Sequence, residues 1–425
     1  MYTLYSILMA VGFVLALPFF LWKARTTGKY LPSFRERLAG PPAGLNAARR
    51  PSIWIHAVSV GEVLTARTLL GPLRERFPGR PVFLSTTTLT GHAVAQQGAA
   101  GVDGLLYSPF DWKGPVRRTL DRLNPALLVI LETELWPNLI HEARRRGVRI
   151  AVVNGRISTR AFPRYRLVTP FLRRVLPEVD VFLMQSEAHA ERIRAIGAPP
   201  DRVRVLGNLK YDAVAEAPVD GPLTRLLRDR AAQPLCVAGS TVAGEEALVL
   251  EAFGRVRARH PHAALVLAPR HPERFAEVEP LIAAAGLRHR RRTALGAAGW
   301  GDADVLLLDT LGELAQAYPA AEVVFVGGSL VSAGGHNVLE PATAGRAIVV
   351  GPHMENFQEI ADIFVGEQAL VRLESGSAGA LAEALLVLLE DEELRARLGG
   401  RARSLIDLNR GARERTLDAL AALVA

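Results

Sequence analysis

One glutamate of the chain stands where a catalytic carboxylate would be useful. Glu62 lies in the segment SVGEV, directly after the apolar run SIWIHAV and a glycine. This change of character indicates a buried strand that passes into a helix, and ligands of open parallel sheets bind where the strands end. A carboxylate there is placed to take a proton from a substrate. It is also placed to cap the first turn of the helix, and the residues alone leave both interpretations open.

The densest glycine cluster has the character of a phosphate site. It reads GGSLVSAGGHNVLEPATAGRAIVVGP, residues 327–352. Glycines allow a ligand close to the backbone, and a helix beginning near Asn337 would direct unpaired N–H groups at an anion. Glu340, one turn into that helix, would accept hydrogen bonds from two ribose hydroxyls. A tight turn before a surface glutamate gives the same pattern, so the cluster alone is weak evidence.

Two familiar nucleotide motifs do not occur in the sequence. Neither Gly-x-Gly-x-x-Gly nor a phosphate loop ending in Gly-Lys-Ser/Thr is found. Their absence disfavours a dinucleotide dehydrogenase and a nucleoside triphosphatase. The single cysteine, Cys236, excludes an internal disulfide framework and a thiolate cluster for zinc, and we expect it to be a core residue.

The elements that position these residues alternate between short apolar runs and amphipathic helices. One series fills 51–212, from SIWIHAVSV to RVRVLGN, and a second restarts with PLCVAGS after the break AVAEAPVDGP. Such alternation indicates parallel sheets covered on both faces. We therefore predict an α/β protein with two Rossmann-like domains, at 51–212 and 223–425, joined by a linker at 213–222. C-terminal helices are expected to belong to the second domain.

Polar residues follow nearly every apolar run, at the edge where the strands of such a sheet end. In the first series they occupy 59–62, 86–88, 132–134, 154–156, 185–187 and 207–210. In the second they occupy 239–241, 269–271, 309–313, 327–329 and 351–353. We expect the two crevices to face each other and to form a cleft for two substrates.

The first 22 residues predict a membrane anchor. Residues 4–22 carry no charge, and their length is close to the roughly 20 apolar residues that cross a bilayer. No signal-peptide cleavage site follows, and a basic juxtamembrane segment at 23–50 keeps the remainder cytoplasmic by the positive-inside rule. Pro18 and the marginal length leave a helix that lies in the interface as an alternative. We expect the protein at the inner membrane, facing the cytoplasm.

The net charge of +8 fits an anionic membrane surface better than nucleic acid. The basic residues are mostly arginines scattered over predicted helices, without interleaved aromatic residues or a nucleic-acid-binding module. We therefore expect no nucleic-acid partner.

Six segments, in order along almost the whole chain, resemble the signature segments of 3-deoxy-D-manno-octulosonic acid (Kdo) transferases of the lipopolysaccharide inner core. They are HAVSVGE (56–62), ETELWPN (132–138), GNLKYD (207–212), APRHPER (268–274), DTLGEL (309–314) and GGHNVLEP (334–341). The resemblance implies a GT-B glycosyltransferase with CMP-Kdo as donor and a lipid A precursor on the inner leaflet as acceptor. That fold agrees with the architecture predicted from the alternation of elements.

The resemblance also implies roles for individual residues. Glu62 matches the general base of an inverting transfer, and its place beside a helix N-terminus would keep it ionised. Glu132 and Lys210 match positions that assist the transition state, and Lys210 would meet the Kdo carboxylate. Glu134 would point the same way as Glu132 in an extended strand, so the choice between them rests on the match. The residues that match CMP-binding segments are Pro269, Arg270, Leu311, Gly312, Glu313, Asn337, Val338, Leu339 and Glu340.

No metal or other cofactor is expected. Asp302-Ala-Asp304 resembles the Asp-x-Asp that holds a metal in other glycosyltransferases, but it precedes the strand VLLLD, so a solvated turn is the better interpretation. The nearest rival function is a membrane-associated GT-B transferase that uses a UDP-sugar. A catalytically idle nucleotide-binding adaptor is disfavoured because Glu62 and Glu132 are both present.

Overall fold

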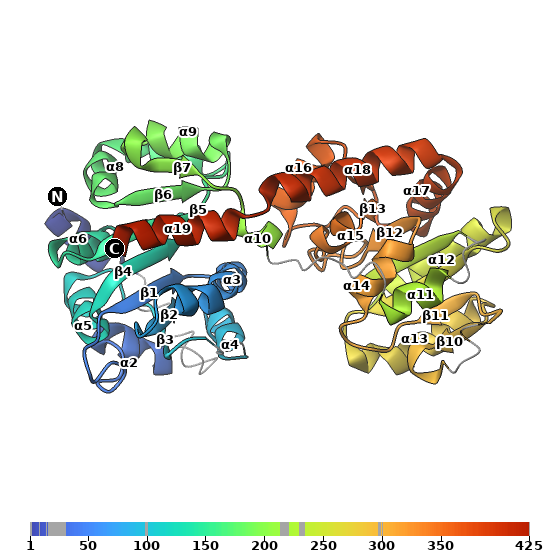
Figure 1. Ribbon diagram of the computed structural model, residues 1–425, viewed down its shortest axis with the longest axis horizontal. Helices are drawn as coiled ribbons and strands as arrows, with labels where there is room; N and C mark the ends of the chain where they lie inside the picture. The colour runs from blue at the N-terminus through green and yellow to red at the C-terminus, as the bar shows by residue number, and fades with distance from the viewer. Residues whose placement is uncertain are drawn as a thin grey trace. The chain divides into compact units, whose positions relative to one another are not determined.

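The computed structural model describes residues 2–7, 9–13, 15, 31–97, 101–212, 221–228, 234–295, 299 and 301–424. The chain divides into two compact units (Figure 1). One comprises Met1–Ala213 and Asn409–Ala425, and the other comprises Val214–Leu408. The predicted linker at 213–222 lies almost wholly outside the described residues.

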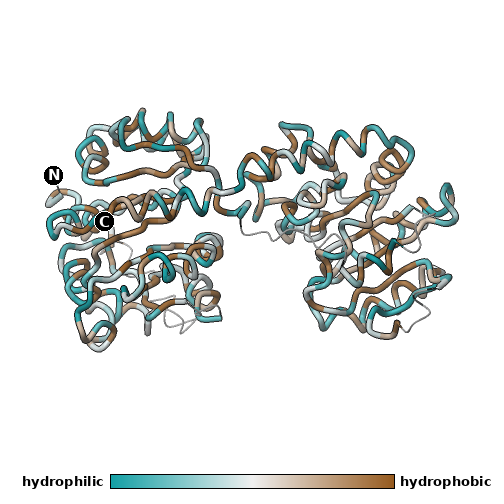
Figure 2. Tube along the Cα trace, in the orientation of Figure 1, coloured by the Kyte–Doolittle hydropathy of each residue, from teal (hydrophilic) through white to brown (hydrophobic). Residues whose placement is uncertain are grey.

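The first unit is built on a seven-stranded parallel sheet, in the order β3-β2-β1-β4-β5-β6-β7. Its strands are β1 Ser52–Ala57, β2 Val82–Thr86, β3 Gly104–Tyr107, β4 Pro125–Leu131, β5 Arg149–Gly155, β6 Val181–Met184 and β7 Val203–Val205. All residues of β1 and β2 are buried, as expected for strands covered on both faces. Figure 2 shows these strands as hydrophobic runs.

Helices before, between and after the strands of this sheet cover its faces. They are α2 Leu31–Ala39, α3 Val60–Arg76, α4 Leu89–Gln97, α5 Lys113–Leu123, α6 Pro137–Arg145, α7 Phe162–Leu167, α8 Thr169–Val175, α9 Glu187–Ala195 and α10 Leu209–Asp212, with the 3-10 turns η1 Leu176–Glu178 and η2 Pro200–Arg202. The prediction of a parallel α/β domain here is confirmed.

The second unit repeats this plan with the order β10-β11-β9-β8-β12-β13-β14, again all parallel. Its strands are β8 Leu235–Thr241, β9 Ala264–Pro269, β10 His289–Arg291, β11 Val305–Leu307, β12 Val323–Val326, β13 Ala347–Val350 and β14 Val371–Arg372. Its helices are α11 Pro222–Arg228, α12 Glu245–Arg259, α13 Phe275–Ala284, α14 Leu314–Ala317, α15 Leu339–Thr343, α16 Gln358–Gly366, α17 Ala378–Glu390 and α18 Glu392–Asn409, with the 3-10 turns η3 Pro272–Arg274, η4 Arg292–Ala294 and η5 Tyr318–Ala320. Cys236 is buried in its core, as expected.

The last helix, α19 (Ala412–Val424), differs from the prediction that residues 223–425 all belong to the second domain. It packs on the first unit, where Figure 1 shows it in red. The reason is its apolar stripe, because Ala412, Leu417 and Leu420 are buried in the core cluster that also contains residues of β1 and α3. Nothing in the local sequence of an amphipathic helix says which of two cores it will cover.

Part of the predicted membrane anchor is visible as a helix in residues 2–7, 9–13 and 15, called here the N-terminal helix. Residues 16–22 of the predicted anchor lie outside the described residues, as does most of the basic segment up to residue 30. Within the described part of the chain, no helix is both long enough and apolar enough to cross a membrane.

Candidate active site

Glu62 is held by the turn between β1 and α3. Ser59 is the N-cap of α3, and its hydroxyl accepts a hydrogen bond from the Glu62 N–H at 3.5 Å. The Glu62 carboxylate in return accepts from Val58 N at 2.8 Å, from Ser59 N at 3.2 Å and from the Ser59 hydroxyl at 2.8 Å. This reciprocal pattern is a capping box. Glu62 therefore does cap a helix, as one of the two interpretations of the sequence expected.

The protonation of Glu62 differs from the expectation that the helix N-terminus keeps it ionised. Burial raises its pKa to about 7, and the nearby Glu132 and Glu134 carboxylates add to the rise. The hydrogen bonds from Val58 and Ser59 oppose it but do not cancel it. Removing a carboxylate from water outweighs the stabilisation by backbone N–H groups here. A carboxylate with this pKa is suited to proton transfer near neutral pH.

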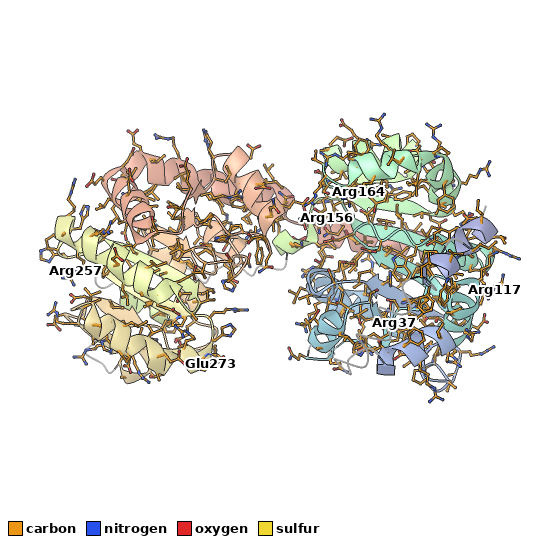
Figure 3. The ribbon with its side chains drawn as sticks, turned by 180° about the vertical axis from the view of Figure 1, so that it is seen from behind. Arg37, Arg117, Arg156, Arg164, Arg257 and Glu273 are labelled. Atoms are coloured by element: carbon orange, nitrogen blue, oxygen red, sulfur yellow. The ribbon has the colours of Figure 1, made fainter. Side chains whose placement is uncertain are left out.

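Glu132 and Lys210 come together at the carboxyl end of the same sheet. Glu132 directly follows β4, adopts a left-handed backbone conformation with φ of 55° and is 8% exposed. Lys210 Nζ lies 3.7 Å from Glu132 Oε1, and Arg156 Nε donates to Glu132 Oε2 at 2.6 Å. Arg156, labelled in Figure 3, follows β5 and was not assigned a role from the sequence. Two cations thus balance one carboxylate beside Glu62.

Glu134 does not continue an extended strand, contrary to the argument from the sequence. The chain turns after Leu131, and Glu134 Oε2 accepts a hydrogen bond from the indole of Trp136 at 3.1 Å. Glu134 still lies close enough to Glu62 to raise its pKa. The two glutamates therefore have different partners, Glu132 an ion pair and Glu134 a neutral donor.

A buried chain of amides positions the turn that carries Lys210. Asn154 Oδ1 accepts from Leu209 N at 3.0 Å, and Gln185 Nε2 donates to the Asn154 carbonyl at 3.0 Å. Asn208 Nδ2 donates to Gln185 Oε1 at 3.2 Å, while its own Oδ1 accepts from Lys210 N at 3.0 Å. Asn154 lies near the end of β5, and Gln185 and Asn208 follow β6 and β7. The sequence shows polar residues at these places without indicating that they would bond to one another.

In the second unit, the structure brings Arg270 and Glu340 into one electrostatic neighbourhood. Burial raises the pKa of Glu340, while its hydrogen bond from Asn337 and the Arg270 charge lower it. Arg270 is exposed, and its backbone N–H donates to the Thr241 carbonyl at 2.8 Å. Burial and the nearby Glu340 carboxylate raise the pKa of Tyr318 well above its ordinary value. Tyr318 lies in this cluster although no motif singled it out.

The helix after the glycine cluster is shorter than expected. It begins at Leu339, near Asn337 as expected, but it has only five residues, so its dipole offers little to a phosphate. The preceding turn is tight. Gly335 has φ of 72°, and a Cβ there would stand 2.3 Å from Met354 Sδ. Glycine is thus needed for packing in the loop.

The remaining residues matched to donor binding differ in what they can offer. Pro269, Val338 and Leu339 are buried, so their side chains are not available to a ligand. Leu311 is 74% exposed, and Gly312 has φ of 83°. Glu313 accepts from Arg292 Nη2 at 2.9 Å and from the Thr310 hydroxyl at 2.5 Å, which fixes its turn.

Asp302-Ala-Asp304 is arranged as a structural element. Asp304 is 6% exposed, pairs with Arg257 and Arg288, and accepts from Arg288 N at 3.0 Å. Burial opposes these interactions, yet they hold its pKa at about 2. It stands at the amino end of β11, away from the edge where strands of this sheet end; Figure 3 labels its partner Arg257. Among the described residues, no cluster of three or more His, Cys, Asp or Glu could hold a metal.

Comparison with known proteins adds to this geometry. Residues 32–213 match the family model described as 3-Deoxy-D-manno-octulosonic-acid transferase (kdotransferase). The chain is 33% identical to a 3-deoxy-D-manno-octulosonic acid transferase of Haemophilus influenzae over 396 residues, 92% of each chain. It is 37% identical to the enzyme of the same name from Bordetella pertussis over 399 residues, 91% of each chain.

Among solved structures, the fold is similar to that of Anabaena Alr3699/HepE in complex with UDP. The TM-score is 0.53 at 13% identity, over 87% of this chain and all of that one. A glycosyltransferase from Rickettsia africae gives a TM-score of 0.50 at 11% identity, over 88% of this chain and 98% of the other. These likenesses show a fold of two parallel α/β domains, as in GT-B glycosyltransferases.

Proposed function

This chain belongs to the family of 3-deoxy-D-manno-octulosonic acid (Kdo) transferases, and from that premise we propose that it moves Kdo from CMP-Kdo to a lipid A precursor in lipopolysaccharide core biosynthesis. The observation that carries the proposal is the buried Glu62, which has a pKa of about 7. Its carboxylate lies near the Glu132–Lys210 ion pair. A proton acceptor and a cation at the same edge of one sheet are what transfer of an acidic sugar to a hydroxyl requires.

Glu62 acts as the general base in this mechanism. It takes the proton of an acceptor hydroxyl while the hydroxyl oxygen forms a bond to the anomeric carbon of Kdo. The bond from that carbon to the phosphate oxygen breaks, and CMP leaves with the electron pair. Because the hydroxyl attacks from the face opposite the leaving phosphate, the configuration at the carbon inverts. The hydrogen bonds from Val58 and Ser59 hold the carboxylate in place during the transfer.

The cations near Glu62 supply charge that the acidic sugar needs. Lys210 meets the Kdo carboxylate, whose burial without a partner would be unfavourable. Arg156 orients Glu132 through its 2.6 Å hydrogen bond. Glu132 then holds Lys210 and orients the acceptor.

The second unit binds the nucleotide in this proposal. Exposed Arg270 contacts the single phosphate through its planar fork, and Glu340 accepts hydrogen bonds from the ribose hydroxyls. The backbone around Pro269, Gly312 and the segment from Asn337 lines the rest of the site. No metal is needed for a donor with one phosphate, and this stays a prediction.

The proposal that the protein binds a membrane rests on the N-terminal helix. One face docks on the first unit, since the Tyr2 hydroxyl donates to Glu178 Oε1 at 2.8 Å and the Tyr5 hydroxyl to Asp111 Oδ2 at 2.9 Å. The opposite face exposes an apolar stripe of Leu4, Ile7, Val11 and Leu15. Helices with such faces lie in membrane interfaces. We place the protein on the cytoplasmic leaflet of the inner membrane.

The experiment that tests the function uses purified protein, CMP-Kdo and a detergent-dispersed lipid A precursor. Mass spectrometry should detect product heavier than the acceptor by one or more Kdo residues, and CMP but not UDP should compete with the donor. Transfer from a UDP-sugar, with competition by UDP alone, would instead support the rival GT-B activity.

A further inference from the structure

Two adjacent glutamates at the start of α12, Glu245 and Glu246, are wholly buried at 0% exposure. Buried carboxylates are expensive unless hydrogen bonds or cations compensate them, so their partners show what they hold. Neither carboxylate is accessible to a ligand. Both bind segments that lead into the proposed nucleotide site.

Glu245 holds the glycine loop that follows β12. Its carboxylate accepts from Gly328 N at 2.6 Å, from Ser329 N at 2.8 Å and from Leu330 N at 2.7 Å. A fourth N–H, from Val242, donates at 3.1 Å. One side chain thus accepts hydrogen bonds from three successive backbone N–H groups of the loop that follows β12.

The held loop is in direct contact with the segment that carries Glu340. Gly335 N donates to the Gly328 carbonyl at 2.6 Å, and His336 Nδ1 lies 2.8 Å from the Gly327 carbonyl. Residues 335 and 336 lead into Asn337, which donates to Glu340 at 3.4 Å. The position of Glu340 therefore depends on the loop that Glu245 fixes.

Glu246 holds the other nucleotide segment. Arg274 donates to it through Nε at 3.3 Å and through Nη2 at 3.0 Å, a two-pronged ion pair. Arg274 ends the turn η3, whose first hydrogen bond runs from Arg274 N to the His271 carbonyl at 3.0 Å. Arg270 lies four residues earlier, at the other end of this turn, where its backbone N–H donates to the Thr241 carbonyl. The turn carrying Arg270 is thus bound at both ends.

We propose that Glu245 and Glu246 are positioning residues for the nucleotide, which set Glu340 and Arg270 in place from beneath the site. The inference rests on the proposed function, because it takes CMP as the ligand. Each glutamate acts through a different loop, so the two should contribute separately to CMP affinity.

The test compares Glu245→Gln and Glu246→Gln in the full chain. Glutamine at 245 turns an amide N–H toward backbone donors, and glutamine at 246 loses the charge that pairs with Arg274. We expect the calorimetric Kd for CMP to rise about tenfold or more in each, since small displacements of binding groups are costly. The KM for the lipid acceptor should stay within a few-fold of the parent. Because Glu246→Gln keeps one oxygen for Arg274, it remains informative if Glu245→Gln does not fold.

Glu142→Gln is the matched control. Glu142 is 1% exposed and accepts from Arg117 at 2.8 and 2.9 Å, but it lies in the first unit and touches no nucleotide segment. It should lower the melting temperature while leaving CMP affinity unchanged. A folded Glu246→Gln variant with parental CMP affinity would overturn the inference. Parent protein that binds no CMP at all would overturn the proposed function, and this inference with it.

Discussion

At the scale of single residues, Glu62 shows how one side chain can serve structure and chemistry together. Its carboxylate completes the capping box of α3, which aims both oxygens at Val58 and Ser59. The same burial that this geometry imposes raises its pKa to about 7. The hydrogen bonds thereby hold the base in place, and burial keeps its pKa near the working pH without an additional activating residue.

The pH dependence of transfer follows from this pKa. Glu62 must be deprotonated to accept a proton, so lowering the pH below about 7 removes the active form. We expect kcat/KM to fall about tenfold per pH unit in that range and to level off above it. The fall should be absent from the residual activity of Glu62→Gln. A parent profile that is flat between pH 5 and 7 would contradict the role of this carboxylate.

Glu340 offers a second test at this scale. Glu340→Gln leaves one acceptor oxygen where two served the ribose, and a hydrogen bond to a charged group contributes roughly 1.5–3 kcal/mol. CMP affinity should fall about tenfold or more. Calorimetry measures this, with Glu390→Gln as a control at an exposed glutamate of α17 that pairs with Arg259. Equal CMP affinity in both variants would remove Glu340 from the site.

The sequence predicts those site residues that lie in a recognisable local motif, and it misses those whose partners are distant in the chain. Glu62, Glu132 and Lys210 were singled out because each lies in a segment that resembles the Kdo transferase family, and the structure brings them together. Arg156 and Tyr318 were missed, since an arginine after a strand and a buried tyrosine have no distinctive local pattern. Glu245 was missed because its partners in the glycine loop lie more than 80 residues away in the chain.

At the scale of elements, the alternation of strands and helices was enough to predict both parallel sheets. Strands buried on both faces are continuous apolar runs, which is a strong local signal. Helix boundaries and partners were less predictable. The chain after Glu132 turns because of its left-handed backbone, and α15 stops after five residues, features that depend on tertiary contacts.

The docking of α19 leads to a prediction about Lys210. Asp212, two residues after Lys210, accepts from Gly411 N at 2.8 Å and from Arg413 N at 2.6 Å, and so caps α19. Asp212→Ala should cost roughly 0.5–2 kcal/mol of stability, as lost helix caps do. Because the Lys210 turn loses its support, kcat should fall as well.

Ser377→Ala separates these two effects. Ser377 caps α17 in the second unit by accepting from Ala380 N at 3.2 Å, so its loss should lower stability by a similar amount. Thermal unfolding and initial rates should be measured on both variants. If Asp212→Ala loses stability but keeps the parental kcat, α19 does not support Lys210.

At the scale of the whole molecule, the net charge of +8 and the N-terminal helix favour an anionic membrane surface. Replacing Leu4, Ile7 and Val11 together with serine should weaken binding to vesicles containing phosphatidylglycerol at least tenfold, because buried apolar side chains each contribute about 1.5–3 kcal/mol. Transfer to detergent-dispersed acceptor should persist, since this face makes no contact with Glu62.

A triple serine variant at Val205, Val387 and Leu408, which are also exposed, is the control for lost surface hydrophobicity. It should bind vesicles like the parent. Sedimentation with vesicles measures both proteins. Equal binding by the two variants would show that the apolar stripe of the N-terminal helix does not hold the protein at the membrane.

The most direct test of the account replaces Glu62 with glutamine and measures CMP affinity and Kdo transfer on one folded preparation. Glutamine keeps an oxygen for the Val58 and Ser59 donors but cannot act as a base, so the rate should drop roughly 10²–10⁴-fold. CMP affinity should not change, and Glu187→Gln, in the first turn of α9, should retain the parental rate. A Glu62→Gln protein that binds CMP normally and transfers Kdo within a few-fold of the parent would contradict the account.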